Sequence, residues 1–273
     1  MTTRTPLTWK HFPAGQDGFF RSPVLLAGAT EAVLVDGGFT LSDGKAMLDA
    51  IAAGDKQLKT IYVSQSDPDY YFSLGPIHAA FPEVPVLAAS DTLAAIVASV
   101  QKKIAAWGPQ LKENGPQSRD AVVFPTAFDA PALTVDGEQI EIVNATGLAN
   151  RRYLWVPSLE AIFGGVLVFS GVHVWTADTA TPALRAAWIT NLDAMAARQP
   201  RIVVAGHATV DAPTDASSIA YTRTYLLAFE EELAKAADST ALIAAMKQRY
   251  PDAGMDVALN IGAKVALGEM PWG

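Results

Sequence analysis

Short apolar runs that alternate with helix-like segments recur in two sets along the chain, and this recurrence limits the fold more than any other feature. Runs rich in β-branched residues are typical of strands, and apolar residues at a 3.6-residue period are typical of helices. The predicted strands are residues 24–26, 32–35, 60–63, 139–143, 152–156, 161–169 and 201–205. The predicted helices are residues 42–53, 90–107, 181–198, 215–236 and 240–250.

The two sets follow each other without a linker rich in Gly and Ser. We therefore expect one domain over residues 1–273, with two halves at about 1–130 and 131–273. Sheets from the two halves can bury their apolar faces against each other, with helices on the outside. This arrangement predicts a mixed α/β (α+β) fold.

The helix after Ala89 has the clearest pattern. Ser90 is expected to be its N-cap, and Gly108-Pro109 is expected to end it. Its apolar residues recur on one face and predict a buried stripe: Leu93, Ile96, Val97, Val100, Ile104 and Trp107.

The composition excludes several kinds of partner and site. The chain carries 20 Lys and Arg against 28 Asp and Glu, a net charge of −8, which argues against a nucleic-acid or anionic-membrane surface. The absence of Cys removes disulfides, thiolate metal sites and cysteine nucleophiles. Residues 1–7 contain no apolar leader, and no apolar run is long enough to span a membrane. We expect a cytoplasmic protein with a small-molecule partner, and homo-oligomerisation stays open.

The common signatures of nucleophile, nucleotide and zinc sites are missing from the sequence. It contains no G-x-S-x-G elbow, no G-x-x-x-x-G-K-[ST] phosphate loop, no G-x-G-x-x-G after the early strands and no H-E-x-x-H. Its four His residues are too few for a His-rich metal site. The informative segment is instead the run 60–63, which leads into a polar stretch at 64–70.

Thr60–Val63 followed by Ser64–Tyr70 resembles the strand and loop that carry the T-H-x-H-x-D-H motif of the metallo-β-lactamase superfamily. Four further segments are similar to landmarks of that family and occur in the same order: Leu34–Gly38, Ala145–Leu148, Phe163–Val166 and Val203–His207. The resemblance covers about residues 24–210. It implies a four-layer αββα sandwich, with the site on loops at one edge of the two sheets. Asp69 and His207 should then lie close together.

The resemblance also implies seven metal-ligand positions, and most of them have changed. The first metal would meet Gln65, Asp67 and Leu148, the second would meet Asp69, Tyr70 and His207, and Val166 stands at the bridging position. Leu and Val cannot ligate a metal, so we expect no cofactor. A weak divalent-metal site at Asp67, Asp69 and His207 remains an alternative.

The remnant of this site supports a hypothesis of metal-independent chemistry on a small apolar molecule. A His oriented by an Asp is a serviceable general acid or base, so Asp69 and His207 would transfer protons, assisted by Tyr70 and Asp67. Hydrolase, isomerase or lyase chemistry would all suit such a pair. The residues expected to contact substrate are Gln65, Ser66, Tyr71, Leu148, Val166, His173 and Trp175.

Two alternatives stay open. Asp69 and His207 could merely satisfy each other in a non-catalytic small-molecule-binding protein, since buried polar groups need partners. A metal-dependent hydrolase with an altered Asp/His site is the other alternative. An open, dry chamber lined by Tyr70, Leu148, Val166 and His207 favours the enzyme, and a filled one favours the binding protein.

Overall fold

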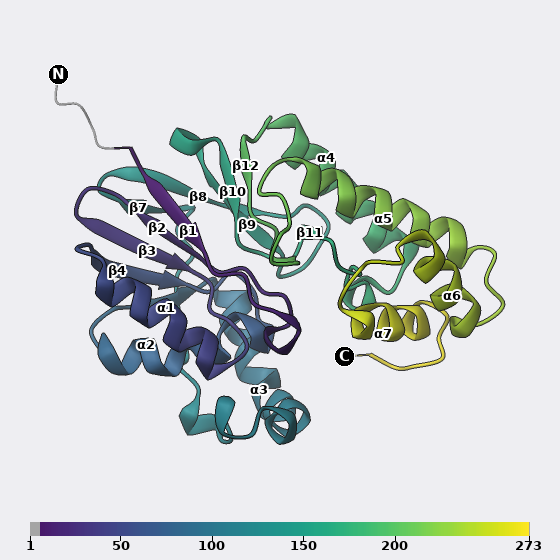
Figure 1. Ribbon diagram of the computed structural model, residues 1–273, viewed down its shortest axis with the longest axis horizontal. Helices are drawn as coiled ribbons and strands as arrows, with labels where there is room; N and C mark the ends of the chain where they lie inside the picture. Colours follow the sequence, from purple (N-terminus) through teal and green to yellow (C-terminus); the bar gives the residue numbers. More distant parts are fainter. Residues whose placement is uncertain (1–5, 273) are drawn as a thin grey trace.

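Two β-sheets form the middle of the molecule in the computed structural model, which describes residues 6–272 (Figure 1). The first sheet has the order β1 (Thr8–His11), β2 (Val24–Ala27), β3 (Glu31–Val35), β4 (Gln57–Tyr62), β5 (Val86–Ala88) and β6 (Thr126–Ala127). The second has the order β12 (Ile202–Val203), β10 (Ala161–Phe163), β9 (Arg152–Val156), β8 (Glu138–Asn144) and β7 (Ala132–Val135). A short parallel pair joins β11 (Phe169–Ser170) to β13 (His207–Ala208).

The two sheets pack face to face over an apolar layer. Val33 and Val35 of β3 are fully buried in one cluster with Leu154 and Val156 of β9, so each sheet turns one face inward. The strands β3, β9 and β10 are buried on both faces, which explains why their sequences are continuous apolar runs rather than alternating ones.

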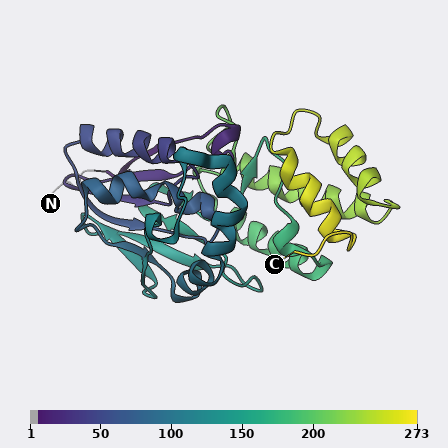
Figure 2. The ribbon, with the colours of Figure 1, turned by 90° about the horizontal axis from the view of Figure 1, so that it is seen from below.

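Helices cover the outer faces of the sheets. The helices are α1 (Leu41–Ala53), α2 (Gly75–Ala80), α3 (Ser90–Leu111), α4 (Pro182–Ala197), α5 (Ser217–Leu233), α6 (Ser239–Arg249) and α7 (Asp256–Ala266). In Figure 1, α1 and α2 lie beneath the first sheet and α4 lies beside the second. Figure 2 shows the C-terminal helices, in green and yellow, gathered at one end of the molecule. None of the helices within residues 6–272 is both long and apolar enough to cross a bilayer.

Several sequence predictions are confirmed and others need correction. The strands predicted at 24–26 and 32–35 and the helix predicted at 181–198 are confirmed as β2, β3 and α4. The N-cap of α3 is Ala89 rather than Ser90, because the Ser90 backbone N–H and hydroxyl both bond to the Asp129 carboxylate. That helix also continues past Gly108-Pro109, and its last residue, Leu111, is buried against the core.

The remaining corrections concern length and exposure. Val97 is 46% exposed, so the buried stripe of α3 is narrower than predicted. The predicted strand 161–169 is two strands, because Gly164 and Gly165 between them adopt positive φ angles of 69° and 75°. The predicted strand 201–205 shortens to β12, and α7 was missed by the sequence analysis.

Candidate functional site

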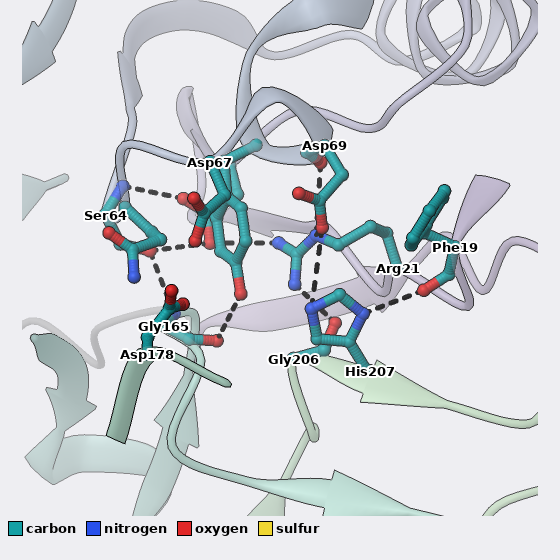
Figure 3. Close-up of polar contacts among 12 residues, drawn as sticks. Phe19, Arg21, Ser64, Asp67, Asp69, Gly165, Asp178, Gly206 and His207 are labelled. Carbon is teal, nitrogen blue, oxygen red and sulfur yellow. Dashed lines mark hydrogen bonds and ion pairs between the residues drawn. The ribbon is translucent and has the colours of Figure 1, made fainter. Parts of the chain in front are cut away.

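Four segments far apart in the sequence meet at the edge of the sheets where β3 and β4 end (Figure 3). β3 runs into Asp36, β4 runs into the loop 64–70, Gly165 follows β10 and His207 begins β13. Because β3 and β4 are parallel, their carboxyl ends open at the same edge. Nε2 of His207 lies 3.5 Å from Oδ2 of Asp69, which confirms the expected proximity of these two residues.

A fully buried arginine lies at the centre of this convergence. Nε of Arg21 donates to the backbone carbonyl of Asp69 at 3.2 Å, and Nη1 donates to the carbonyl of Gly206. Nη2 donates to Oδ2 of Asp36 at 3.3 Å. The guanidinium carbon also stands 3.5 Å from the centroid of the Tyr70 ring, a cation–π contact. One side chain thus binds groups from three of the four converging segments.

Asp36 is held by donors on both carboxylate oxygens. Its Oδ1 accepts from the backbone N–H of Ser64 at 2.7 Å, and its Oδ2 accepts from the Ser64 hydroxyl at 2.9 Å. That hydroxyl in turn accepts from the Gly165 N–H at 2.9 Å. Burial raises the pKa of Asp36, while the Arg21 charge and the hydrogen bonds from Ser64 act to lower it. The carboxylate therefore joins β3, the loop after β4 and the segment after β10.

His207 is held in its neutral form. Its Nδ1 lies 2.7 Å from the carbonyl oxygen of Phe19, which can only accept, so Nδ1 carries the proton. Burial lowers the pKa of His207 to about 3, and the neighbouring Arg21 charge adds to this. The ring also stacks on Phe169, with centroids 5.0 Å apart and planes 11° apart. Nε2 therefore presents a lone pair toward Asp69.

Asp69 faces that lone pair with an oxygen that has no hydrogen-bond partner among the described residues. Burial raises the pKa of Asp69 to about 7, and the charge of Asp67 adds to the rise, while Arg21 opposes it. A proton on Asp69 would let this oxygen donate to Nε2 of His207 across the 3.5 Å that separates them. The raised pKa of Asp69 favours such a proton.

The chamber around this pair is filled. Tyr70 is fully buried and its hydroxyl donates to the Gly165 carbonyl at 3.1 Å. A separate small cavity of about 10 Å³ is lined by Leu148, Val166 and Trp175 but not by Asp69, Tyr70 or His207, and it has about the size of one water molecule. The side chains of Asp69 and His207 are 10% and 4% exposed. The Asp69–His207 pair is therefore shielded from solvent.

Comparison with solved structures identifies the architecture. No protein-family model and no curated protein matches the sequence. A beta-lactamase domain protein from Burkholderia ambifaria matches with a TM-score of 0.65 at 13% identity, over 96% of this chain and 84% of that one. A metallo-beta-lactamase family protein from Thermus thermophilus matches with a TM-score of 0.61 at 17% identity, over 97% and 93%. The chain has the metallo-β-lactamase fold. A metallo-beta-lactamase from Pontibacter korlensis matches more loosely, with a TM-score of 0.53 at 18% identity over 83% and 96%.

The residues at the metal-ligand positions of this metallo-β-lactamase fold do not fit a metal. Within residues 6–272, no three His, Asp or Glu side chains are grouped so that they could hold an ion. Asp67 turns to Lys103, with Oδ1 3.1 Å from Nζ, so it does not join Asp69 and His207. The weak divalent-metal site expected at these three residues is therefore not assembled. The guanidinium of Arg21 already supplies a positive charge there.

The other predicted contact residues of the loop are Gln65, Ser66 and Tyr71, and all three are buried. Oε1 of Gln65 accepts from the Ser66 N–H at 2.6 Å, and its Nε2 has no partner among the described residues. The Ser66 hydroxyl accepts from Nδ2 of Asn150 at 3.0 Å. Tyr71 is buried against Phe72, with ring centroids 5.2 Å apart.

His173 lies elsewhere, although the sequence analysis placed it near the pocket. It is 1% exposed, and its Nδ1 is 2.9 Å from the Tyr225 hydroxyl of α5. Its Nε2 is 3.7 Å from Asp256 of α7. The backbone N–H of His173 bonds to Gly254 just before α7, so the missed helix draws this segment away from the pocket. Trp175, which was also predicted to contact substrate, does line the small cavity.

Sequence reasoning missed Arg21 altogether. The signal that could have found it is electrostatic: Asp36 and Asp69 converge in this fold, and no metal remains to neutralise them. A buried carboxylate needs a cation or several donors. The few Arg residues in apolar surroundings were therefore candidates, and Arg21 follows Phe19-Phe20 directly.

A larger groove opens beside the closed chamber at the same edge of the sheets. It has a volume of about 540 Å³ and lies between the start of α3, the segment after β6 and the β8–β9 connection. Leu148 borders both this groove and the small cavity. The lining includes the apolar walls Phe128, Pro131 and Ile142 and the polar groups Tyr62, Ser90, Asp91, Asp129, Asn144, Asn150, Arg151 and Arg152.

Proposed function

We propose that this protein binds a small organic molecule in the groove beside the chamber, and that the buried Asp69–His207 centre is structural. The main support for the proposal is the difference in volume between the groove and the space left around the buried pair. The side chains of Asp69 and His207 are almost wholly buried and the small cavity at Leu148 and Val166 holds only about 10 Å³, whereas the groove holds about 540 Å³, within the usual range for ligand sites. Its place at the carboxyl ends of parallel strands is also the common one for ligands in α/β sheets.

The charged residues of the groove indicate an uncharged ligand, because each has a partner within the protein. Arg152 donates to both carboxylate oxygens of Asp91, at 2.7 and 2.9 Å. Asp129 accepts from Ser90, and Arg151 pairs with Asp178 at 3.0 Å. A charged ligand would have to break one of these pairs. The ligand is therefore more polar than the apolar molecule expected from the sequence, but neutral.

Tyr62 supplies a hydrogen-bond donor toward this ligand. Its side chain lines the groove, and its buried hydroxyl has no partner among the described residues. Burial raises the pKa of Tyr62, so the hydroxyl stays protonated at physiological pH. A ligand acceptor at this point would remove the cost of an unpaired buried donor, which is about 1–3 kcal/mol. Phe128 offers an apolar wall for the other face of such a molecule.

Filling the groove should abolish binding. We expect fragments found by ligand-observed NMR to bind the wild type at one competitive site and to be lost in Ala149→Trp, because the indole occupies the groove. Ala149 is exposed, so the substitution adds no strain to the core. Ala52→Trp, at an exposed position on α1, is the matched control and should keep every fragment. Fragments that persist in Ala149→Trp would place the binding site elsewhere.

Metal-independent acid–base chemistry is the second candidate function, and the raised pKa of Asp69 beside His207 favours it. Strongly shifted pKa values are frequent among catalytic groups, and a carboxyl group that titrates near pH 7 can donate or accept a proton. The chemistry would require an opening of the chamber that admits a small ester or lactone.

This candidate makes a kinetic prediction. If hydrolysis of p-nitrophenyl acetate or of simple lactones is detected, Asp69→Asn and His207→Gln should each lower kcat/KM by about 10²-fold or more. The double variant should lose little beyond either single one, because the two residues act as a unit. Asp193→Asn, an exposed carboxylate paired with Arg223, is the control. Full activity in Asp69→Asn would exclude the pair as the catalytic groups.

A further inference from the structure

We infer that the guanidinium of Arg21 is a resident cation that takes the place of a metal in this fold. It lies beside Asp69 and His207, the two positions that keep the residue types of metal ligands. Its Nε is 3.6 Å from Oδ2 of Asp69, the same oxygen that faces Nε2 of His207 at 3.5 Å. The inference concerns this centre alone and does not depend on the groove.

The surroundings of Arg21 match a planar cation rather than a spherical one. Acceptors lie around the edge of the guanidinium, from the Asp69 carbonyl through the Gly206 carbonyl to the Asp36 carboxylate. The Tyr70 ring covers one face at 3.5 Å. In-plane acceptors with an aromatic ring on the face are the pattern that suits arginine. Figure 3 shows the guanidinium beside the contact between Asp69 and His207.

Charge explains why this cation is needed. Asp36 and Asp69 are both buried at this centre, and burial raises the pKa of each. One fixed positive charge keeps at least one of them ionised, as a metal ion would. The same charge disfavours a second cation in the same place, and Leu148 and Val166 offer no ligand atoms to compensate.

The backbone that carries Arg21 is shaped for this role. Phe19 and Phe20 precede it with φ angles of 57° and 55°, and side chains other than Gly rarely adopt this left-handed region. Two backbone hydrogen bonds to β13 and the residue before it hold this turn. The Ala208 N–H donates to the Phe20 carbonyl at 2.8 Å, and the Ser22 N–H donates to the Gly206 carbonyl at 3.2 Å. A Cβ at Gly206 would lie 2.1 Å from the Gly165 carbonyl and 3.2 Å from Nη1 of Arg21, so only glycine fits there.

Chemical rescue tests the inference. Arg21→Ala should lower the Tm by about 10 °C, because it leaves buried carboxylates without their cation. Ethylguanidinium at about 20 mM, far below denaturing concentrations, should restore several degrees of that loss by filling the vacated space. Urea has a similar planar shape without the charge and should restore none, and the wild type should not respond to either compound. A Tm for Arg21→Ala within about 1 °C of the wild type, or equal rescue by urea, would overturn the inference.

A second pair of variants covers the case in which Arg21→Ala does not fold. Arg21→Lys keeps the charge and Arg21→Met keeps much of the volume, so the lysine variant should retain the higher Tm. A methionine variant that is as stable as the lysine variant would show that Arg21 acts by packing alone. Wild-type protein purified without added metal should contain well under one equivalent of zinc by elemental analysis. Stoichiometric zinc whose removal lowers the Tm would refute the replacement of metal by arginine.

Discussion

Asp36→Asn should destabilise the protein by about 3–5 kcal/mol, the range for breaking a buried ion pair. Both oxygens of Asp36 accept hydrogen bonds, from the Ser64 N–H, the Ser64 hydroxyl and Arg21. The Ser64 hydroxyl donates to Asp36, because an ionised carboxylate oxygen can only accept. An amide NH₂ in place of either oxygen would therefore face a donor, and Arg21 would lose its counter-charge. Urea unfolding followed by circular dichroism measures the loss.

The backbone conformation at position 36 should not add to the measured loss of stability. Asp36 has a φ of 63°, and Asn tolerates the left-handed region about as well as Asp. Asp136 is the matched control: its φ is 48°, and its carboxylate also accepts from a hydroxyl and backbone N–H groups, those of Thr30 and Glu31. Because that carboxylate is solvated, Asp136→Asn should cost far less. Equal losses at the two positions would mean that the ion pair with Arg21 contributes little.

The pH dependence of stability should reverse between two variants of the Asp69–His207 pair. Asp69 has a raised folded-state pKa of about 7, so its contribution to the free energy of unfolding decreases as the pH rises from about 4 to 7. His207 has a lowered folded-state pKa of about 3, so its contribution decreases as the pH falls from about 6.5 to 3. In the wild type the two slopes oppose each other between about pH 4 and 6.5.

The difference between each variant and the wild type should report the slope of the group that was replaced. Relative to the wild type, Asp69→Asn should become less stable as the pH falls from about 7 to 4, by up to about 1.4 kcal/mol per pH unit, because the contribution of Asp69 is lost. His207→Gln should instead become less stable relative to the wild type as the pH rises from about 3 to 6.5, because the contribution of His207 is lost. Urea unfolding of the three proteins across this range, compared as differences, cancels the other titrating groups. Parallel curves for the two variants would show that neither group has the shifted pKa described above.

The parts of the fold that sequence could predict are those set by local pattern. The β2–β3 hairpin, α1 and the Pro182 start of α4 follow from short-range apolar spacing, turn residues and caps. The landmark segments also indicated that Asp69 and His207 would meet. Short-range sequence patterns failed where a contact with a residue far away in the sequence determines the local structure. Ser90 bonds to Asp129 rather than capping α3, and burial of Leu111 carries that helix past Pro109.

The centre of the site could not be read from the sequence because its main residue acts over a long separation. Arg21 bonds to the carbonyl of Gly206, 185 residues away, and reaches it from an unusual backbone conformation at Phe19 and Phe20. No periodic pattern or motif marks such a side chain. His173 shows the opposite case, since a plausible position in the sequence was overridden by packing against α5 and α7.

A cation that is covalently part of the chain also changes how this protein depends on its surroundings. A fold that needs a dissociable ion is stabilised by mass action, so its folded fraction follows the free concentration of that ion. The charge of Arg21 is covalently attached to the chain and cannot leave it as a bound ion would. The folded population should therefore be indifferent to metal starvation or metal excess. Folding can also be completed as soon as the chain is whole, without waiting for an ion to be delivered.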